Sequence, residues 1–289
     1  MFKKKKDQTY QSYWSISWNI FKKNKVAMVC LFIVILLCLI ALFAPLIAPY
    51  HPNKQVLTDR LMKPCGQHWF GTDDLGRDIF SRIIYGCRVS LSVGIISQII
   101  ATVIGYTMGV CAGYFGGKVD SVISFLIQVF SSFPFLLFAM AIMFVLGPGL
   151  INLYLALGLL GWASTARLIR GDVMRLKKME YIDACKVSGG NSFRIIMKHL
   201  LPNCLSTLIV TVTLGIPNAI MSEASLSFLG LGVKAPMASW GSMISFSQPY
   251  IRSATYYSVI PGLAIIITVL AFNMLGDGLR DALDPKLRS

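Results

Sequence analysis

Residues 181–203 read YIDACKVSGGNSFRIIMKHLLPN, a basic and mostly polar segment that lies between long apolar runs. With the polar residues before it, this segment forms a stretch (169–203) of roughly 35 residues, which is too short to hold a stable domain of its own. The stretch is also too long to be a simple turn between two bundled helices. We therefore expect it to dock onto another protein.

The same stretch predicts two short helices separated by a turn. The expected helices are Asp183–Val187 and Ser192–Leu201, and Gly189-Gly190 separates them because glycine tolerates a positive φ. Pro202 is suited to the first turn of the apolar helix that follows, where a backbone N–H has no partner in any case.

The rest of the chain is apolar enough to lie in a membrane. Hydrophobic residues make up 55% of the sequence and charged residues 14%, with a mean hydropathy of +0.65. A helix needs about 20 residues to cross the hydrocarbon core. Six apolar runs are candidates, near residues 26–48, 89–112, 122–146, 150–168, 204–228 and 258–276. Because the backbone must satisfy its own hydrogen bonds in lipid, and the runs are too long for barrel strands, we predict an all-α integral membrane protein with six transmembrane helices.

Basic residues orient these spans. An even number of spans puts both termini on one side, and the lysines at positions 3–6, 22, 23 and 25 indicate that this side is the cytoplasm. On this topology most of the 27 lysines and arginines lie inside, so the net charge of +14 is mainly a signal of orientation. A nucleic-acid-binding protein would need a basic folded surface with elements that enter a groove, and no such pattern is present.

The 181–203 segment resembles the cytoplasmic coupling loop of importer-type ABC permeases. The family pattern is E-A-A, three residues, G, nine residues, then I-x-L-P. The matching positions here are Asp183, Ala184, Cys185, Gly189, His199, Leu201 and Pro202. The sequence departs from the pattern at Asp183, Cys185 and His199, of which the last is usual in the peptide subfamily. The resemblance implies that this helix–turn–helix sits in a groove on an ATPase and transmits ATP-driven closure to the spans.

The outside segment 50–88 carries a second pattern. Asp74–Arg88 predicts a short amphipathic helix, with Asp78 and Arg82 at i,i+4 opposite its apolar face, and Asp73 and Arg77 have the same spacing. From the pattern alone, these pairs would be solvated ion pairs of an interfacial helix, each worth only a few tenths of a kcal/mol.

Residues 68–94, HWFGTDDLGRDIFSRIIYGCRVSLSVG, also resemble the signature of one ABC permease subfamily, the peptide and nickel permeases. The matching residues are Gly71, Thr72, Asp73, Gly76, Arg77, Asp78, Ser81, Arg82, Gly86, Arg88, Ser90 and Leu91. Residues 222–241 and 261–285 resemble the C-type half of the same subfamily. The resemblance therefore covers nearly the whole chain after about residue 20.

This resemblance implies an N-terminal helix followed by a five-helix type I importer core. The expected division is a cytoplasmic tail (1–25), an N-terminal helix with an outer segment (26–88), a permease domain (89–277) that contains the coupling loop (169–203), and a second cytoplasmic tail (278–289). The implied location is the inner or plasma membrane of a bacterial or archaeal cell. The implied partners are a homologous second permease, two ATPase subunits, an extracellular or periplasmic substrate-binding protein and membrane lipid, with no nucleic acid.

The sequence does not carry the ATPase itself. A phosphate-binding loop would read G-x-x-x-x-G-K-[ST], and the nearest candidate, residues 116–119, lacks the first glycine and the final hydroxyl residue. Comparable catalytic sets are also missing, so we expect a non-catalytic subunit without a cofactor of its own, with ATP and Mg bound by the ATPase subunits. Cys65-x-x-His68 with His51 is too sparse to predict a metal site, and we do not expect Cys65 to pair with Cys87.

Polar and helix-breaking residues within the spans are candidates for the transport pathway. Glu223 is the one acidic residue predicted inside a span, where it would border an outer gate, pair with an arginine, or hold the outer loop. Proline and glycine are expected to interrupt two spans, at residues 131–134 and 215–217. The first interruption makes Ser131, Ser132 and Pro134 pathway candidates.

We interpret the chain as the permease subunit of an ABC importer for oligopeptides or dipeptides. The same machine carrying nickel or a metal chelate remains an alternative, because the motifs are shared. A self-sufficient channel or ion-coupled transporter is a different class, which would need intramembrane charge relays or inverted repeats.

Overall fold

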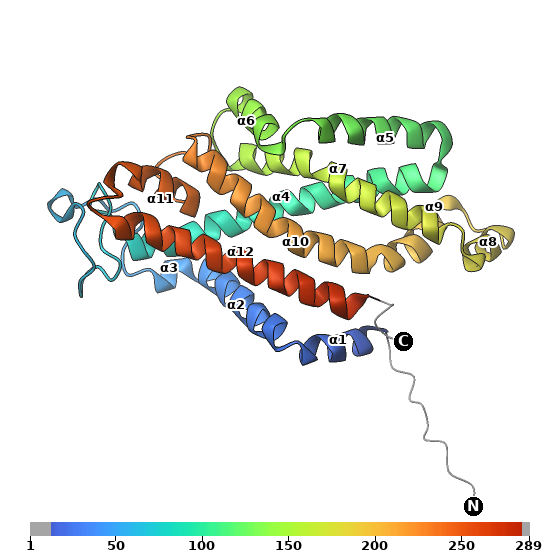
Figure 1. Ribbon diagram of the computed structural model, residues 1–289, viewed down its shortest axis with the longest axis horizontal. Helices are drawn as coiled ribbons and strands as arrows, with labels where there is room; N and C mark the ends of the chain where they lie inside the picture. The colour runs from blue at the N-terminus through green and yellow to red at the C-terminus, as the bar shows by residue number, and fades with distance from the viewer. Residues whose placement is uncertain (1–12, 285–289) are drawn as a thin grey trace, which may run out of the picture.

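The computed structural model describes residues 13–284, which are almost entirely helical (Figure 1). The only β pairing in this range is an isolated bridge between Thr72 and Asp78. The elements are α1 (Tyr13–Lys23), α2 (Lys25–Leu42), α3 (Ala44–Ile47), η1 (Leu57–Asp59), α4 (Ile79–Phe115), α5 (Gly117–Ser132), α6 (Phe135–Leu146), α7 (Leu150–Leu176), α8 (Glu180–Val187), α9 (Ser192–Ile195), η2 (Ile196–Leu200), α10 (Leu201–Phe228), α11 (Trp240–Ser247), η3 (Gln248–Tyr250) and α12 (Thr255–Leu283). The lysines at positions 3–6 and the last five residues lie outside the described range.

Four helical runs in the described range are long and apolar enough to cross a membrane: α2, α4, the continuous run Ser192–Phe228, and α12. A fifth is obtained if α5 and α6 are counted as one span bent by 90° at their junction. The all-α membrane class is therefore confirmed, whereas the count of six stays a prediction. Helix α7 would be the sixth span, but its second half contains Arg167, Arg170 and Arg175, which reduce its apolar character.

The prediction of a separate helix in the outer segment is wrong. The separate amphipathic helix Asp74–Arg88 does not form, because α4 begins only at Ile79 and then continues unbroken to Phe115. The backbone before it turns at Gly76, where φ is +69°, and Asp78 caps the helix by accepting a hydrogen bond from Ser81 N at 2.7 Å. The expected boundary between residues 88 and 89 consequently falls inside a helix.

The two predicted interruptions behave differently. Ser132 and Phe135 bound a real break, since α5 ends and α6 begins there with a sharp bend. Helix α10 instead runs straight through Gly215 and Pro217, so this interruption is wrong. A proline is tolerated inside a span where neighbouring helices pack around it, and Pro217 is buried.

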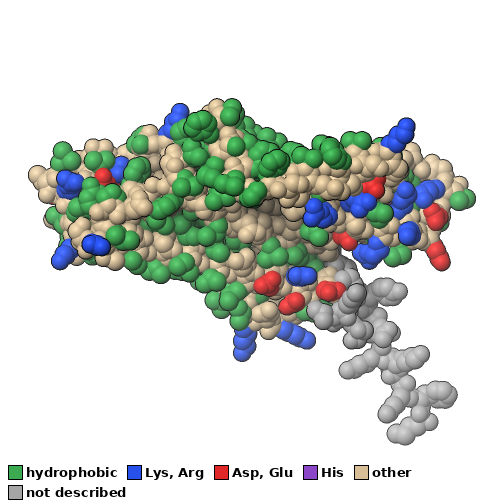
Figure 2. Space-filling model, turned by 45° about the horizontal axis from the view of Figure 1, so that its top comes forward, with side chains coloured by type: hydrophobic (Ala, Val, Ile, Leu, Met, Phe, Trp, Pro, Cys, Tyr) green, Lys and Arg blue, Asp and Glu red, His purple; other side chains and the backbone are tan. Residues whose placement is uncertain are grey.

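The helices lie roughly along one long axis, so the molecule has two distinct ends (Figure 1). Helices α8 and α9 lie at one end with α1 and the last turns of α12, and we call this the α8 end. The segment that joins α3 to α4 lies at the other end with α11, and we call this the α11 end. Charged side chains gather mostly toward the two ends, while the middle of the surface is largely hydrophobic (Figure 2).

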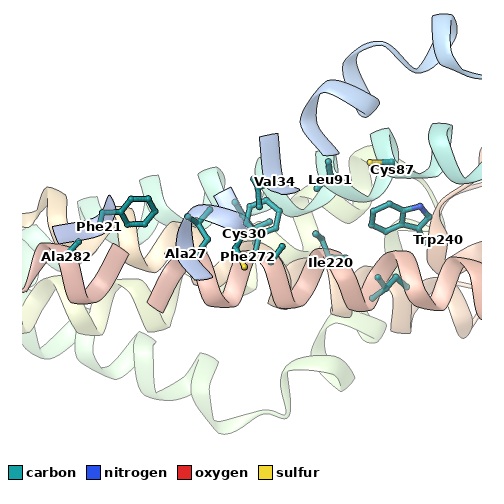
Figure 3. Close-up of a cluster of buried hydrophobic side chains, with 14 residues drawn as sticks. Phe21, Ala27, Cys30, Val34, Cys87, Leu91, Ile220, Trp240, Phe272 and Ala282 are labelled. Atoms are coloured by element: carbon teal, nitrogen blue, oxygen red, sulfur yellow. The ribbon is translucent and has the colours of Figure 1, made fainter. Parts of the chain in front are cut away.

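The largest buried cluster joins the N-terminal helices to the rest of the bundle (Figure 3). The cluster includes Phe21 of α1, Cys30 of α2, Ile220 of α10, Trp240 of α11 and Phe272 of α12. Helices α1 and α2 are thereby fixed along one side of α12.

Helices α4 and α7 approach closely because α4 has glycines at the contact. A Cβ placed at Gly105, Gly109 or Gly113 would lie 2.6–2.9 Å from atoms of α7, a separation that real Cβ atoms do not show. Small residues of this kind allow helix backbones to pack in a membrane, where apolar surface alone does not drive helices together.

We predict that Gly109→Ala lowers the thermal midpoint of the purified protein by several degrees. The added methyl would lie 2.7 Å from the carbonyl oxygen of Ala166, and such overpacking costs about 1–3 kcal/mol. Gly171→Ala on α7 is the matched control, because nothing lies within 4 Å of its Cβ position. Equal midpoints for the two variants in a detergent melting assay would contradict this account of the α4–α7 contact.

Candidate functional site

A cavity of about 1030 Å³ opens among the long helices. Its wall is formed by α4, the α5–α6 junction, α7, α10 and the last residues of α12. The polar lining residues are Ser97, Gln98, Ser131, Ser164, Thr165, Ser206, Thr207, Thr211, Asn218, Ser222, Arg280 and Asp284. The cavity is therefore large enough for a drug-sized or larger solute and is lined mainly by hydroxyls, amides and apolar groups.

Only some of the predicted pathway residues line this cavity. Ser131 lines it, and its Oγ accepts a hydrogen bond from Arg167 Nη2 at 3.0 Å. Ser132 and Pro134 do not line it, and the Ser132 hydroxyl instead donates to the carbonyl of Gln128 at 2.8 Å. The break between α5 and α6 contributes aromatic rings to the wall through Phe133 and Phe135.

Most of the remaining lining was not identified from the sequence. The residues on α4 and α10, such as Gln98, Thr211 and Asn218, belong to helices whose polar positions look like ordinary hydroxyls and amides within apolar runs. Only the packed structure shows that these residues line the same cavity. Gly215 was noticed as a helix breaker, but it lies in an intact helix and lines the cavity.

The predicted coupling loop forms a helix–turn–helix at the α8 end. Helix α8 ends just before Gly189, which has a φ of +80°, and Asn191 then caps α9 by accepting a hydrogen bond from Arg194 N at 2.8 Å. The second helix does not stop at Leu201, because a π-helical turn, Ile196–Leu200, joins α9 to α10. The loop is consequently continuous with a helix long and apolar enough to span a membrane.

One face of this loop is anchored and the other is exposed. Ile182, Ile195 and Leu200 are buried against α4 and α7 in one hydrophobic cluster. On the opposite face, Val187 is 90% exposed and Phe193 is 71% exposed. The loop therefore presents large apolar side chains on its outer face.

The other loop residues lie as follows. Asp183 and Ala184 are exposed on α8, where Asp183 pairs with Lys186 at 2.7 Å. Cys185 is half-buried, and its carbonyl accepts a hydrogen bond from Gly190 N at 2.9 Å. His199 lies beside Tyr181, with ring centroids 6.1 Å apart. Leu201 and Pro202 start α10, and Pro202 occupies its first turn as predicted.

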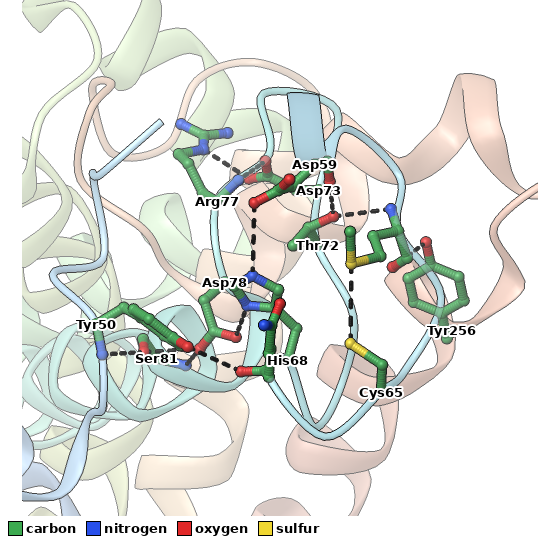
Figure 4. Close-up of polar contacts among 12 residues, drawn as sticks. Tyr50, Asp59, Cys65, His68, Thr72, Asp73, Arg77, Asp78, Ser81 and Tyr256 are labelled. Carbon is green, nitrogen blue, oxygen red and sulfur yellow. Dashed lines mark hydrogen bonds and ion pairs between the residues drawn. The ribbon is translucent and has the colours of Figure 1, made fainter. Parts of the chain in front are cut away.

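The outer-segment motif forms a buried polar network at the α11 end (Figure 4). Asp73 accepts hydrogen bonds from Arg77 N at 2.9 Å and Arg77 Nε at 2.6 Å, and Arg82 Nε lies 3.4 Å from the same carboxylate. All three side chains are nearly inaccessible. The expected Asp73–Arg77 pair is therefore present, but it is buried rather than solvated.

Asp78 and Arg82 do not pair with each other. Asp78 binds Ser81 at the start of α4 and lies 2.9 Å from Nδ1 of His68, while Arg82 donates to the carbonyl of Pro52 at 3.1 Å. The contact of His68 with Asp78 was not predicted from the sequence, because no local spacing pattern connects the two residues.

Backbone constraints complete this network. The Thr72 hydroxyl bridges Asp59 O and Met62 N, and a Cβ at Gly71 would lie 2.5 Å from the Met62 carbonyl. Gly76 has even less room, with the carbonyl of Val56 at 1.8 Å. Arg88 alone among the singled-out signature residues is exposed, farther along α4.

Glu223 is fully buried in α10 and is hydrogen-bonded to serines rather than to an arginine. Its carboxylate accepts from Ser227 at 2.6 Å and from Ser90 of α4 at 3.3 Å. Ser227 in turn lies 3.5 Å from Ser239, which caps α11. Glu223 does not line the cavity, so this geometry favours its role in holding the outer elements together.

Comparison with known families agrees with this architecture. The model of the binding-protein-dependent transport system inner membrane component matches residues 102–289. The chain belongs to this family. A second model, the N-terminal TM domain of oligopeptide transport permease C, matches residues 12–64 of this permease.

Individual relatives cover almost the whole permease. The dipeptide transport system permease protein DppC of Bacillus subtilis is 46% identical over 96% of this chain and 87% of its own length. The oligopeptide transport system permease protein OppC of the same organism is 42% identical over 96% of this chain and 91% of its own. The glutathione transport system permease protein GsiD of Pectobacterium atrosepticum is 41% identical over 98% and 95%, respectively.

The fold of the permease is that of a solved transporter. A chain of the inward-facing MetNI methionine ABC transporter superposes with a TM-score of 0.57 at 19% identity, covering 71% of this chain and 98% of its own. The expected type I importer fold is thus confirmed.

We predict that Asp73→Ala destabilises the permease strongly. The change would leave Arg77 and Arg82 buried without their carboxylate, and removal of one partner of a buried ion pair costs about 3–5 kcal/mol. The measurement is the thermal midpoint in detergent, with Asp277→Ala, an exposed acid of α12, as the control. A fall no greater than that of the control would show that the network is not needed for stability.

We predict that Glu223→Gln leaves both assembly and uptake unchanged, because the amide oxygen can still accept from Ser227 and Ser90. Glu223→Ala should instead destabilise the permease by about 1–3 kcal/mol, as expected when buried hydroxyls lose their acceptor. Loss of uptake in an assembled Glu223→Gln complex would point to a gate.

Proposed function

We propose that this permease is the membrane-spanning subunit of an ATP-driven importer of oligopeptides or dipeptides. The observation that carries the proposal is the cavity of about 1030 Å³, which is bounded by membrane helices and is mainly uncharged. Short peptides vary in side chain and charge, so a roomy pathway without a fixed ionic site suits them. The names of the dipeptide and oligopeptide transport relatives support the same cargo.

The remaining parts of the machine are proposed as separate subunits. A homologous permease completes the pathway, an external binding protein delivers the peptide at the α11 end, and two ATPase subunits bind ATP and Mg and hydrolyse the ATP. On this proposal the permease itself is not catalytic, and its α8 end is cytoplasmic. Basic residues at that end, including Lys22 and Lys23 of α1, support the orientation.

The coupling role is assigned to the α8–α9 loop. The loop presents Val187, Phe193 and Met197 outward while Ile182 and Leu200 anchor it to the bundle. A hollow lined in part by Gly189, Phe193 and Met197 lies on the exposed face. A movement of the docked ATPase would be carried directly into α10, because no flexible segment separates α9 from it.

The cargo is tested by uptake in cells with and without the gene. We expect deletion to abolish uptake of labelled di-, tri- and pentapeptides and the wild-type gene to restore it, while nickel accumulation is unchanged. Unchanged peptide uptake with loss of nickel accumulation would overturn the cargo and keep the transporter. Unchanged uptake of both would overturn the proposal.

We predict that Gly189→Asp abolishes peptide uptake in the same cells. Its φ of +80° and its place on the docking face make an aspartate unfavourable both for the turn and for an apolar contact. Gly116→Asp is the matched control, since Gly116 has a φ of +70°, open space around its Cβ position, and lies in the α4–α5 turn. Equal losses in the two variants would show that strain alone, not docking, explains the effect.

A further inference from the structure

The charges of the cavity wall are confined to one place. Among the described residues that line the cavity, the charged ones are Arg280 and Asp284, both near the end of α12. The rest of the polar wall consists of hydroxyls and two carboxamides, Gln98 and Asn218. Away from the end of α12, a solute along this wall would therefore meet neutral hydrogen-bonding groups rather than ions.

Gln98 differs from Asn218 in how its amide is used. Asn218 Nδ2 donates to the carbonyl of Leu214 in its own helix at 3.1 Å. Gln98 Nε2 makes a longer contact of 3.3 Å with Thr102 Oγ1, and its Oε1 accepts no hydrogen bond from any residue of the described range. The carboxamide is thus mostly unused by the fold, although only 9% of the residue is exposed.

Gly215 of α10 creates the place where this carboxamide lies. A Cβ at Gly215 would lie 2.2 Å from both Cδ and Oε1 of Gln98, so any side chain there would displace the amide. Gln98 comes from the middle of α4 and Gly215 from the middle of α10, and both line the cavity. The amide therefore fills the space that the absent side chain of Gly215 leaves on α10, well away from both ends of the spans.

Two further hydroxyls on the same wall lack partners. Ser97 Oγ and Thr165 Oγ1 are buried and have no hydrogen-bond partner in the described structure. Buried polar groups are almost always paired, and an unpaired one costs free energy that a bound group could recover. Ser97 precedes Gln98 on α4, and Thr165 of α7 packs against Gly105 farther along α4, so unpaired hydroxyls occur on both helices of this wall.

We propose that Gln98 is a binding contact for the main-chain amide groups of the cargo peptide as it crosses the membrane. A carboxamide offers one acceptor and two donors, the same pair of functions that a peptide group presents. Because it is neutral, it can bind any residue sequence without holding a charged side chain or terminus. This inference rests on the proposed peptide cargo, and it assigns the recognised group to the backbone.

The test uses vesicles that contain the complete transporter, with binding protein preloaded to saturation by the peptide. The cargo is labelled trialanine or its analogue methylated at the central amide nitrogen. We expect Gln98→Met, which keeps the length of the side chain but not its amide, to lower trialanine uptake about three- to tenfold, the effect of one hydrogen bond. The analogue should be transported slowly by the wild type and no more slowly by Gln98→Met.

Gln128→Met is the matched control, because Gln128 is exposed on α5 and does not line the cavity. It should discriminate between the two peptides as the wild type does. Gly215→Ala supplies an independent variant that moves the amide without removing it, and it should also lose the discrimination. Uptake is expressed per assembled complex, and Gly215→Ala decides the question if Gln98→Met does not assemble.

Two results would overturn this inference without affecting the proposed function. One is that Gln98→Met takes up trialanine at the wild-type rate. The other is that Gln98→Met loses uptake of trialanine and of the methylated analogue equally, which indicates a structural role. Retained discrimination in Gly215→Ala would do the same. Failure of the wild-type transporter to move either peptide would instead overturn the proposed function and this inference with it.

Discussion

Close backbone contact along α4 is the constraint on which the rest of the structure depends. Inside a membrane, apolar side chains gain little by leaving lipid for protein, so helices are held by close packing and polar contacts. Helix α4 achieves this with glycines on more than one face. Helix α7 packs against Gly105, Gly109 and Gly113. Ile216 and Ile220 of α10 pack against Gly94, and Trp240 of α11 packs against Gly86.

The two ends of α4 make different kinds of contact. At the α11 end, the helix starts at a cap residue, Asp78, whose carboxylate also holds His68 of the preceding segment. The buried Asp73–Arg77–Arg82 group sits beside it and fixes that segment over the helix start. At the α8 end, α4 is held by α7, and Lys177 Nζ donates to the carbonyl of Tyr114. A buried ion-pair network thus fixes the segment at the α11 end of α4, while the other end carries the loop that is proposed to bind the ATPase.

The sequence predicted the long apolar elements and the coupling loop well, because hydrophobic length and a helix–glycine–helix pattern are local properties. It misplaced the start of α4, because residues 74–78 have helical spacing but are held in a turn by Asp73, which accepts hydrogen bonds from Leu75 N, Gly76 N and Arg77 N. Gly76 in this turn also lies against the remote carbonyl of Val56, which leaves no room for a side chain. The burial of Asp73 and Arg82 depends equally on segments distant in sequence. The cavity could not be predicted for the same reason, since Gln98, Ser131 and Asn218 meet only when three helices are packed.

The contact between Gln98 and Gly215 lies where the proposed coupling would act. Helix α10 continues from the α8–α9 loop through a π-helical turn and past Pro217, so no break in the helix separates the loop from Gly215. Helix α4 packs against α7 at three glycines and against α10 at Gly94. A displacement of α10 relative to α4 would therefore change the space beside Gly215. If the carboxamide of Gln98 binds the peptide backbone, ATPase closure would alter that binding directly, which links the energy source to the cargo without any flexible gate between them.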